Sequence, residues 1–170
     1  MTIIGDGEHA SVIRDALEPI KDAGTLIVAI GNVATRRKVA REAEWAMSEK
    51  WATVIHPSAT VSRNAKIAGG VYVGPGAIIN TGAVIGQHAI INSGAIVEHD
   101  VTVGEFVNVN PGVAIGGGAS IGEGTVLGLG CRVRDHIKIG ANVTVGMGAV
   151  VVSDVPDGVT VMGCPAKVVG

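Results

Sequence analysis

His99 and Asp100 are neighbouring residues whose types could carry acid–base chemistry. They lie in the segment Val97-Glu98-His99-Asp100-Val101-Thr102. An imidazole exchanges a proton near neutral pH, and an adjacent carboxylate can fix its tautomer and raise its basicity. The same two residues also fit an ordinary solvated turn. Their role therefore depends on the elements that position them.

Those elements follow a period of six residues that runs unbroken from Ile55 to Pro156. An apolar residue begins each hexad, and the residue four positions later is also apolar, except at Thr125. The residues that begin the hexads are Ile55, Val61, Ile67, Val73, Ile79, Ile85, Ile91, Val97, Val103, Val109, Ile115, Ile121, Leu127, Val133, Ile139, Val145 and Val151. This period is typical of a parallel β-helix, in which three hexads form one coil.

Each hexad then predicts a short strand followed by a turn, with inward apolar side chains. Successive coils lie about 4.8 Å apart, which gives a prism about 27 Å tall. The residue after each hexad's first residue is often Gly or Asn, and we expect it to supply the positive φ of the turn. Because a stack of coils has open edges and flat walls, we also expect caps and side-by-side assembly.

Stacking also predicts which residues share a column on the surface of the prism. His99 aligns with Thr81, Gly117 and Asp135, and Asp100 aligns with Gly82, Gly118 and His136. Glycines beside a histidine predict an open groove at this corner.

The composition narrows the function classes. The chain has 170 residues, 47% of them hydrophobic but only 2% aromatic, which suits a narrow core of β-branched side chains. A net charge of −2 gives no reason to expect a nucleic-acid or membrane-surface partner. No apolar run reaches the length of a membrane span, and the start does not resemble a signal peptide. Cys131 and Cys164 are interpreted as reduced thiols, so we expect a cytoplasmic protein.

Residues 1–50 follow a different pattern and predict a small βαβα unit. Strands are expected at 2–4 and 25–30, and helices at 10–20 and 34–49, with Val39, Ala43, Ala46 and Met47 on one face of the second. Gly5, Gly7 and Ala10 match a phosphate-binding turn spacing, although a capping turn explains them equally simply. Trp45 and Trp51 are expected to bury the seam with the first coil. A strand-like tail is expected over 159–169.

The hexads, the segment Glu98-His99-Asp100 and the ending Gly163-Cys164-Pro165-Ala166-Lys167 together resemble the left-handed β-helix acyltransferases. The chain is most similar to sialic acid O-acetyltransferases and to N-acetyltransferases of nucleotide-linked amino sugars. The resemblance implies a mainly β protein: a left-handed parallel β-helix over 51–170 and a small, truncated Rossmann-like substrate-binding domain over 1–50. Left-handedness comes from the resemblance alone, since β-crossovers are normally right-handed.

The resemblance also implies site roles. His99 would be the general base and Asp100 its partner. The acyl donor, acetyl-CoA, would contact Asn108, Gly117, Leu129, Met147 and Lys167. Gly7, Glu8, His9 and Gly31 would line the sugar-nucleotide site. The oxyanion donor would be the Asn108 amide or the Gly117 N–H, and the working unit would be a homotrimer acting in glycan precursor synthesis.

Other functions on the same fold stay open. Zinc hydration, as in the γ-class carbonic anhydrases, needs histidines two coils apart, but His99 and His136 fall in different columns, so no metal is expected. A non-catalytic sugar-nucleotide-binding scaffold is a second possibility. Acyl transfer to a non-sugar acceptor such as serine is a third, and the choice between an amine and a hydroxyl acceptor stays open.

Overall fold

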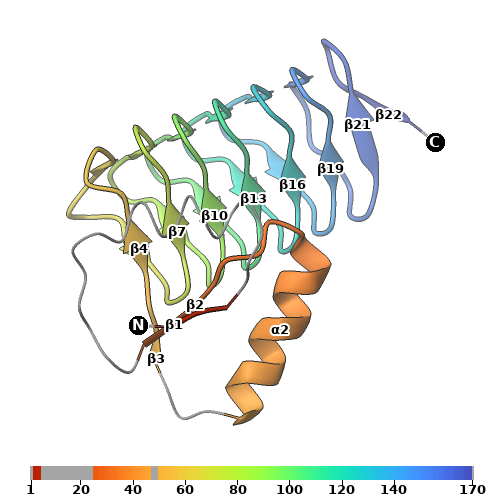
Figure 1. Ribbon diagram of the computed structural model, residues 1–170. Helices are drawn as coiled ribbons and strands as arrows, with labels where there is room; N and C mark the ends of the chain where they lie inside the picture. Colours follow the sequence, from red (N-terminus) through yellow and green to blue (C-terminus); the bar gives the residue numbers. More distant parts are fainter. Residues whose placement is uncertain (1, 5–24, 47–49, 170) are drawn as a thin grey trace.

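The computed structural model describes residues 2–4, 25–46 and 50–169. Its main body is a left-handed parallel β-helix in which each coil contributes one short strand to each of three flat walls. Figure 1 shows the coils stacked from β4 at one end to β21 and β22 at the other. The predicted fold class is confirmed.

The first wall contains β4 (Val54–Ile55), β7 (Tyr72–Val73), β10 (Ile90–Ile91), β13 (Asn108–Val109), β16 (Val126–Leu127), β19 (Thr144–Val145), β21 (Thr160–Met162) and β22 (Lys167–Val169). The second wall contains β5 (Thr60–Val61), β8 (Ile78–Ile79), β11 (Ile96–Val97), β14 (Ala114–Ile115), β17 (Arg132–Val133) and β20 (Val150–Val151). The third wall contains β6 (Lys66–Ile67), β9 (Val84–Ile85), β12 (Thr102–Val103), β15 (Ser120–Ile121) and β18 (Lys138–Ile139).

The strand register confirms the predicted coil. Ile90 pairs with Asn108 and Ile96 with Ala114, so each residue meets the one 18 positions further on. The second residue of each strand from β7 to β20 points inward and is buried, as the hexad pattern predicts. Ile55 begins the first hexad but is exposed, because it lies at the open end of the stack.

Thr125 and Cys131 are the two exceptions to a purely hydrocarbon core among the inward residues described above, and the Thr125 hydroxyl keeps its hydrogen bonds. The Thr125 hydroxyl donates to the Gly140 carbonyl at 2.8 Å and accepts from the Val143 N–H at 3.1 Å. Cys131 is buried as expected, and burial raises the pKa of its thiol to about 11. Both Cys131 and Cys164 are free thiols.

The turns correct one sequence-based expectation. Positive φ occurs at the fourth residue of the hexad, as at Gly94 and Gly112, and not at the residue after the first. Glycines at the latter place, such as Gly86, have a different cause: a Cβ at Gly86 would lie 2.6 Å from the backbone nitrogen of Glu105 in the next coil. Glycine there permits close stacking of the coils.

The carboxyl-terminal end of the stack is capped. The predicted tail forms a hairpin in which β21 pairs in antiparallel register with β22. On the third wall, Asp154 Oδ1 accepts the Lys138 N–H at 2.8 Å, and Asp157 Oδ1 accepts the Ala141 N–H at 2.8 Å. These carboxylates stand in for the carbonyl groups of a further coil, which protects the edge of the sheet.

The amino-terminal unit has a parallel sheet in the order β1 (Thr2–Ile4), β2 (Thr25–Val28) and β3 (Lys50–Trp51). Strands β1 and β2 are predicted from the sequence, whereas β3 is not. The second predicted helix is confirmed as α2 (Val33–Ala46), which begins where Asn32 Oδ1 accepts the Thr35 N–H at 2.9 Å. The predicted helix over 10–20 lies outside the described residues.

The seam between this unit and the first wall differs from expectation in which residues of α2 it buries. Among the residues of α2 whose side chains the structure describes, Arg36 and Ala40 are the most deeply buried, whereas the expected face residues Val39 and Ala43 are only half-buried. On the β-helix side, His88 lies in a turn, with a φ of 57°, and is fully buried. Its ring lies 4.5 Å from the Trp51 ring and stacks on Phe106 at 5.0 Å, since both partners reach the same corner of the prism.

Trp51 packs into this seam, as predicted. The side chain of Trp45 lies outside the described residues.

Candidate active site

His99 and Asp100 occupy the corner between β11 on the second wall and β12 on the third. Asp100 has a φ of 60°, the left-handed conformation that Asp tolerates better than most residues. Its carboxylate Oδ2 lies 3.0 Å from Nδ1 of His99. Because an ionised carboxylate only accepts, Nδ1 carries the proton in the neutral ring and Nε2 carries the lone pair.

The surroundings of His99 favour its charged form. The hydrogen bond to Asp100 raises the pKa of His99 above its ordinary value, and the charges of Asp100 and Glu98 act in the same direction. Both side chains of the pair are largely exposed to solvent. The imidazole is therefore an accessible base of increased strength.

The Gly117–Gly118 step of the next coil forms a notch beside this base. A Cβ at Gly117 would lie 2.5 Å from Nε2 of His99, and a Cβ at Gly118 would lie 2.5 Å from Nδ1 of His136. The two histidines therefore approach the same pair of glycines from the coils on either side. The two glycines make room for the imidazole rings, since any larger residue would collide with one of them. An open groove at this corner stays a prediction.

His136 is a neighbour of this notch that the sequence analysis does not include in the site. Its Nε2 lies 3.9 Å from Oδ2 of Asp135, and its side chain is exposed. Its separation of 18 residues from Gly118 is the signal in the sequence that could have identified it.

Asn108 lies away from His99, on β13 of the first wall. Its Oδ1 accepts from Arg36 Nη2 at 2.5 Å, and its Nδ2 donates to the Gly31 carbonyl at 2.7 Å. Both ends of the amide therefore bind the amino-terminal unit. Within one chain the structure does not bring Asn108 and His99 together.

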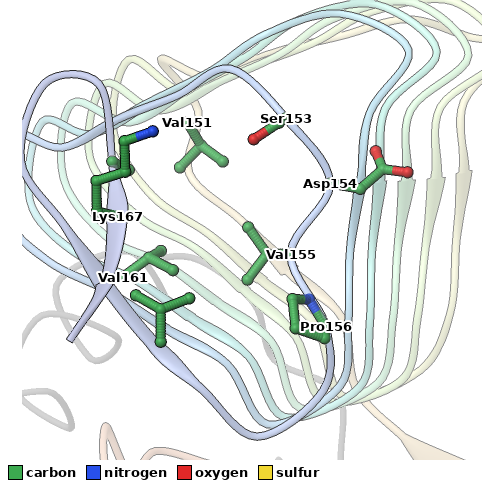
Figure 2. Close-up of a pocket in the computed structure, with 9 residues that line it drawn as sticks. Val151, Ser153, Asp154, Val155, Pro156, Val161 and Lys167 are labelled. Carbon is green, nitrogen blue, oxygen red and sulfur yellow. The ribbon is translucent and has the colours of Figure 1, made fainter. Parts of the chain in front are cut away.

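The other predicted donor-site residues are spread along the prism. Leu129 and Met147 lie one above the other at a corner that follows the first wall, and they are 52% and 77% exposed. Lys167 lies beside a cavity of about 140 Å³ at the carboxyl-terminal end. Figure 2 shows Lys167 and Asp154 at opposite sides of this cavity, with Val151 and Val155 between them and Val161 on the side of Lys167.

Of the predicted acceptor residues, Gly31 alone falls within the described residues. It follows β2, and its carbonyl accepts from Arg36 Nη1 at 3.1 Å as well as from Asn108. Gly7, Glu8 and His9 lie outside the described residues.

Residues 2–4, 25–46 and 50–169 contain no cluster of three or more His, Cys, Asp or Glu side chains that could bind a metal ion. The one helix within these ranges, α2, is too short and too polar to cross a bilayer.

Solved structures of other proteins are similar to this chain. No protein-family model and no curated protein matches the chain. Among solved structures, PerB from Caulobacter crescentus in complex with CoA and GDP-perosamine is 36% identical, with a TM-score of 0.94, over 99% of this chain and 96% of that one.

Two more structures are similar to the chain over almost its whole length. A single-residue variant of perosamine N-acetyltransferase from Caulobacter crescentus, also with CoA and GDP-perosamine, is 35% identical with a TM-score of 0.92 over 99% and 95% of the two chains. The acetyltransferase domain of PglB from Neisseria gonorrhoeae, in complex with acetyl coenzyme A, is 32% identical with a TM-score of 0.92 over 98% and 97%.

The stacked coils and these similarities thus define a left-handed β-helix acyltransferase. Within that class, the chain belongs to the family of β-helix sugar acetyltransferases that includes these structures. The predicted family and enzyme class are confirmed. The CoA or acetyl-CoA in each related structure agrees with the predicted acyl donor.

Proposed function

We propose that the protein transfers the acetyl group of acetyl-CoA to the amine of a nucleotide-linked amino sugar, with His99 as the general base. The observation that carries this proposal is the orientation of His99. Nδ1 is held 3.0 Å from the Asp100 carboxylate, which leaves Nε2 beside the Gly117–Gly118 notch. The amine is favoured over a hydroxyl acceptor by similarity to perosamine N-acetyltransferase.

The proposed reaction is a direct transfer without an acyl-enzyme. As the amine nitrogen attacks the thioester carbonyl carbon, Nε2 of His99 takes the proton that the nitrogen loses. The tetrahedral intermediate then expels the sulfur of CoA, and the C–S bond breaks. His99 returns the proton to the thiolate, giving CoA–SH and the N-acetyl sugar.

The oxyanion of the intermediate requires a hydrogen-bond donor near His99. The Gly117 N–H is the better of the two predicted donors, because Gly117 adjoins the His99 ring whereas Asn108 binds Arg36 and Gly31. One such donor contributes about 10²–10³-fold to the rate in other enzymes. A contact between acetyl-CoA and Asn108 stays a prediction.

We assign the acceptor to the amino-terminal unit, residues 1–50, and acyl transfer to residues 51–170. Gly7, Glu8, His9 and Gly31 would line the acceptor site. Support comes from the complexes with GDP-perosamine, whose likeness to this chain includes the amino-terminal unit. In that site Glu8 would bring a negative charge toward the diphosphate, so Glu8→Gln is expected to bind the nucleotide more tightly.

A homotrimer would complete the donor site, since Leu129 and Met147 expose apolar surface that a pantetheine arm and a second chain could cover. Four outward residues of the second wall are half-buried and apolar, whereas the other two are exposed and polar: Ile78, Ile96, Ala114 and Val150 against Thr60 and Arg132. On the third wall most outward residues are polar, and one is an exposed valine: Lys66, Thr102, Ser120 and Lys138 against Val84. The second wall therefore fits a neighbouring chain better than the third wall does. Lys167 would pair with a phosphate of CoA.

The test is release of free CoA thiol from acetyl-CoA against a panel of nucleotide-linked amino sugars, free sialic acid and serine. Turnover is expected with an amino-sugar nucleotide. Resistance of the product to hydroxylamine would identify an amide, because O-acetyl esters are cleaved. Turnover with serine alone would instead support a non-sugar acceptor. Binding of CoA and sugar nucleotide without turnover would support a non-catalytic scaffold.

A further inference from the structure

Arg36 is a buried cation that joins the amino-terminal unit to the β-helix. It lies in the first turns of α2 and is only 1% exposed. Nη1 donates to the carbonyl groups of Ile30 and Gly31 at 2.7 and 3.1 Å. On the other side, Nε donates to the His88 carbonyl at 3.1 Å, and Nη2 donates to the Phe106 carbonyl at 2.9 Å and to Asn108 Oδ1 at 2.5 Å.

None of these acceptors is a carboxylate. Burial lowers the pKa of Arg36 to about 10, and the nearby charge of Arg37 acts in the same direction, yet the group stays protonated at neutral pH. Among the residues that the structure describes, no carboxylate pairs with Arg36. A buried charge without a counter-ion is costly, and apolar side chains of similar volume would hold two units together at lower cost. The guanidinium instead fixes the orientation of the two units relative to each other, because its planar fork binds several carbonyl groups at once.

The groups that accept hydrogen bonds from Arg36 lie in two parts of the molecule that the proposed acetyl transfer requires. Ile30 and Gly31 form the turn after β2, where we place part of the acceptor site. Phe106 and Asn108 lie in the same coil as His99, nine residues or fewer beyond it. The intervening strand β12 is paired on both sides, with β9 and β15. The coil is therefore a rigid connection between Arg36 and the base.

Arg37 makes two further contacts that support the same position of α2 on the β-helix. Arg37 lies over the Phe106 ring, 5.4 Å from its centroid, and its Nη2 is 3.0 Å from Glu123 Oε1 in the following coil. Arg36 and Arg37 thus hold α2 against the corner that begins at Phe106. Both pin the helix at the level of the coil that carries His99.

We propose that Arg36 is a positioning residue for the acceptor: it fixes the Ile30–Gly31 turn at the level of the His99 coil, so that a sugar nucleotide held by the amino-terminal unit presents its amine at the height of the base. This inference rests on the proposed function. A lysine cannot replace Arg36, because one ammonium group cannot reach acceptors on both sides of the seam.

The kinetic test compares Arg36→Ala, Arg36→Lys and Arg36→Met with Arg41→Ala, an exposed arginine on the same helix. For the three Arg36 variants the acceptor KM is expected to rise about tenfold or more, while the KM for acetyl-CoA stays within about twofold. Millimolar guanidinium should restore activity to Arg36→Ala, whereas urea or ammonium at the same concentration should not. Arg41→Ala should behave as the wild type.

Equal loss of both substrates' affinities without rescue, or full activity in Arg36→Met, would overturn the proposal. Amide hydrogen exchange provides a readout that needs no turnover. In Arg36→Ala, peptides covering residues 29–33 should exchange about tenfold faster, while peptides from the second wall should not change. If the wild type transfers no acetyl group, the proposed function fails, and unchanged exchange near Gly31 would separately overturn the role of Arg36.

Discussion

Gly117 lies one coil beyond His99, directly beside its imidazole ring. A Cβ added at Gly117 would lie 2.5 Å from Nε2 of His99, closer than two non-bonded atoms can approach. The backbone reinforces this stacking, because the Gly118 N–H donates to the His99 carbonyl at 2.9 Å. The base and the notch beside it are therefore fixed by the same register that builds the wall.

Gly117→Ala should consequently impair catalysis much more than folding. The methyl group must displace the His99 ring, and misplacement of a catalytic group by about 1 Å can cost about 10²-fold in rate. Gly117 does not have a positive φ, so alanine introduces no backbone strain. The measurement is kcat/KM together with Tm, with Thr81→Ala, in the same column, as control. Wild-type activity in Gly117→Ala would contradict the assigned position of the base.

The pH profile should report the pair His99–Asp100. The base must be unprotonated, so kcat/KM should rise with pH through an apparent pKa above the ordinary histidine value of 6.5. Asp100→Asn removes the hydrogen bond from an ionised partner and its charge, both of which raise that pKa. The acid limb should then move to lower pH, while the maximal rate falls because the tautomer is no longer fixed. An acid limb that does not move would argue against His99 as the titrating base.

Phe106 offers a test of the corner geometry, because it has a φ of 56° although it carries a bulky side chain. Phe106→Ala should cost about 3–5 kcal/mol in the free energy of unfolding through lost packing against His88 and Arg37. Phe106→Gly should be about 1 kcal/mol more stable than Phe106→Ala, since glycine adopts this conformation without the steric penalty. Urea unfolding of both variants checks the order, and the usual order, with alanine more stable, would contradict it.

Two classes of glycine should respond differently to alanine. Gly94 has a φ of 63° and open space around it, so Gly94→Ala should cost about 1–2 kcal/mol, the steric penalty alone. At Gly86 a Cβ would meet the backbone of Gly104 and Glu105, which cannot move without separating the coils. Gly86→Ala should therefore be the more destabilising substitution in thermal unfolding. Equal losses would show that the stacking distance does not require glycine.

The sequence predicts the β-helix well, because one physical constraint repeats in every hexad. A residue that points into a narrow prism must be apolar or, like Thr125, must have its hydrogen bonds satisfied there, so the period gives the walls, the register and the column that joins His99 to Gly117. The same reasoning is wrong about the turn: it assigns the positive φ to the residue after the first of each hexad, whereas the fourth residue has it. Glycine serves two purposes in each coil, and composition alone does not separate positive φ from close stacking.

The seam is where prediction from sequence fails. Arg36 looks like one more charge on a polar helix, and the turn that carries His88 shows no sign of burial, because nothing in their own segments reveals the opposite surface. Their burial depends on contacts between residues as distant in sequence as Arg36 and Asn108. Asn108 could be related to the donor site only by resemblance, and its hydrogen bonds depend on how α2 docks.

The most direct test of the account is acetyl transfer by His99→Ala, compared with His56→Ala, a histidine in the first coil of the stack. With an amino-sugar nucleotide as acceptor, kcat should fall by about 10²–10⁴-fold in His99→Ala, with both KM values nearly unchanged. His56→Ala should match the wild type. Full activity in His99→Ala would contradict the central claim that this imidazole removes the proton from the acceptor.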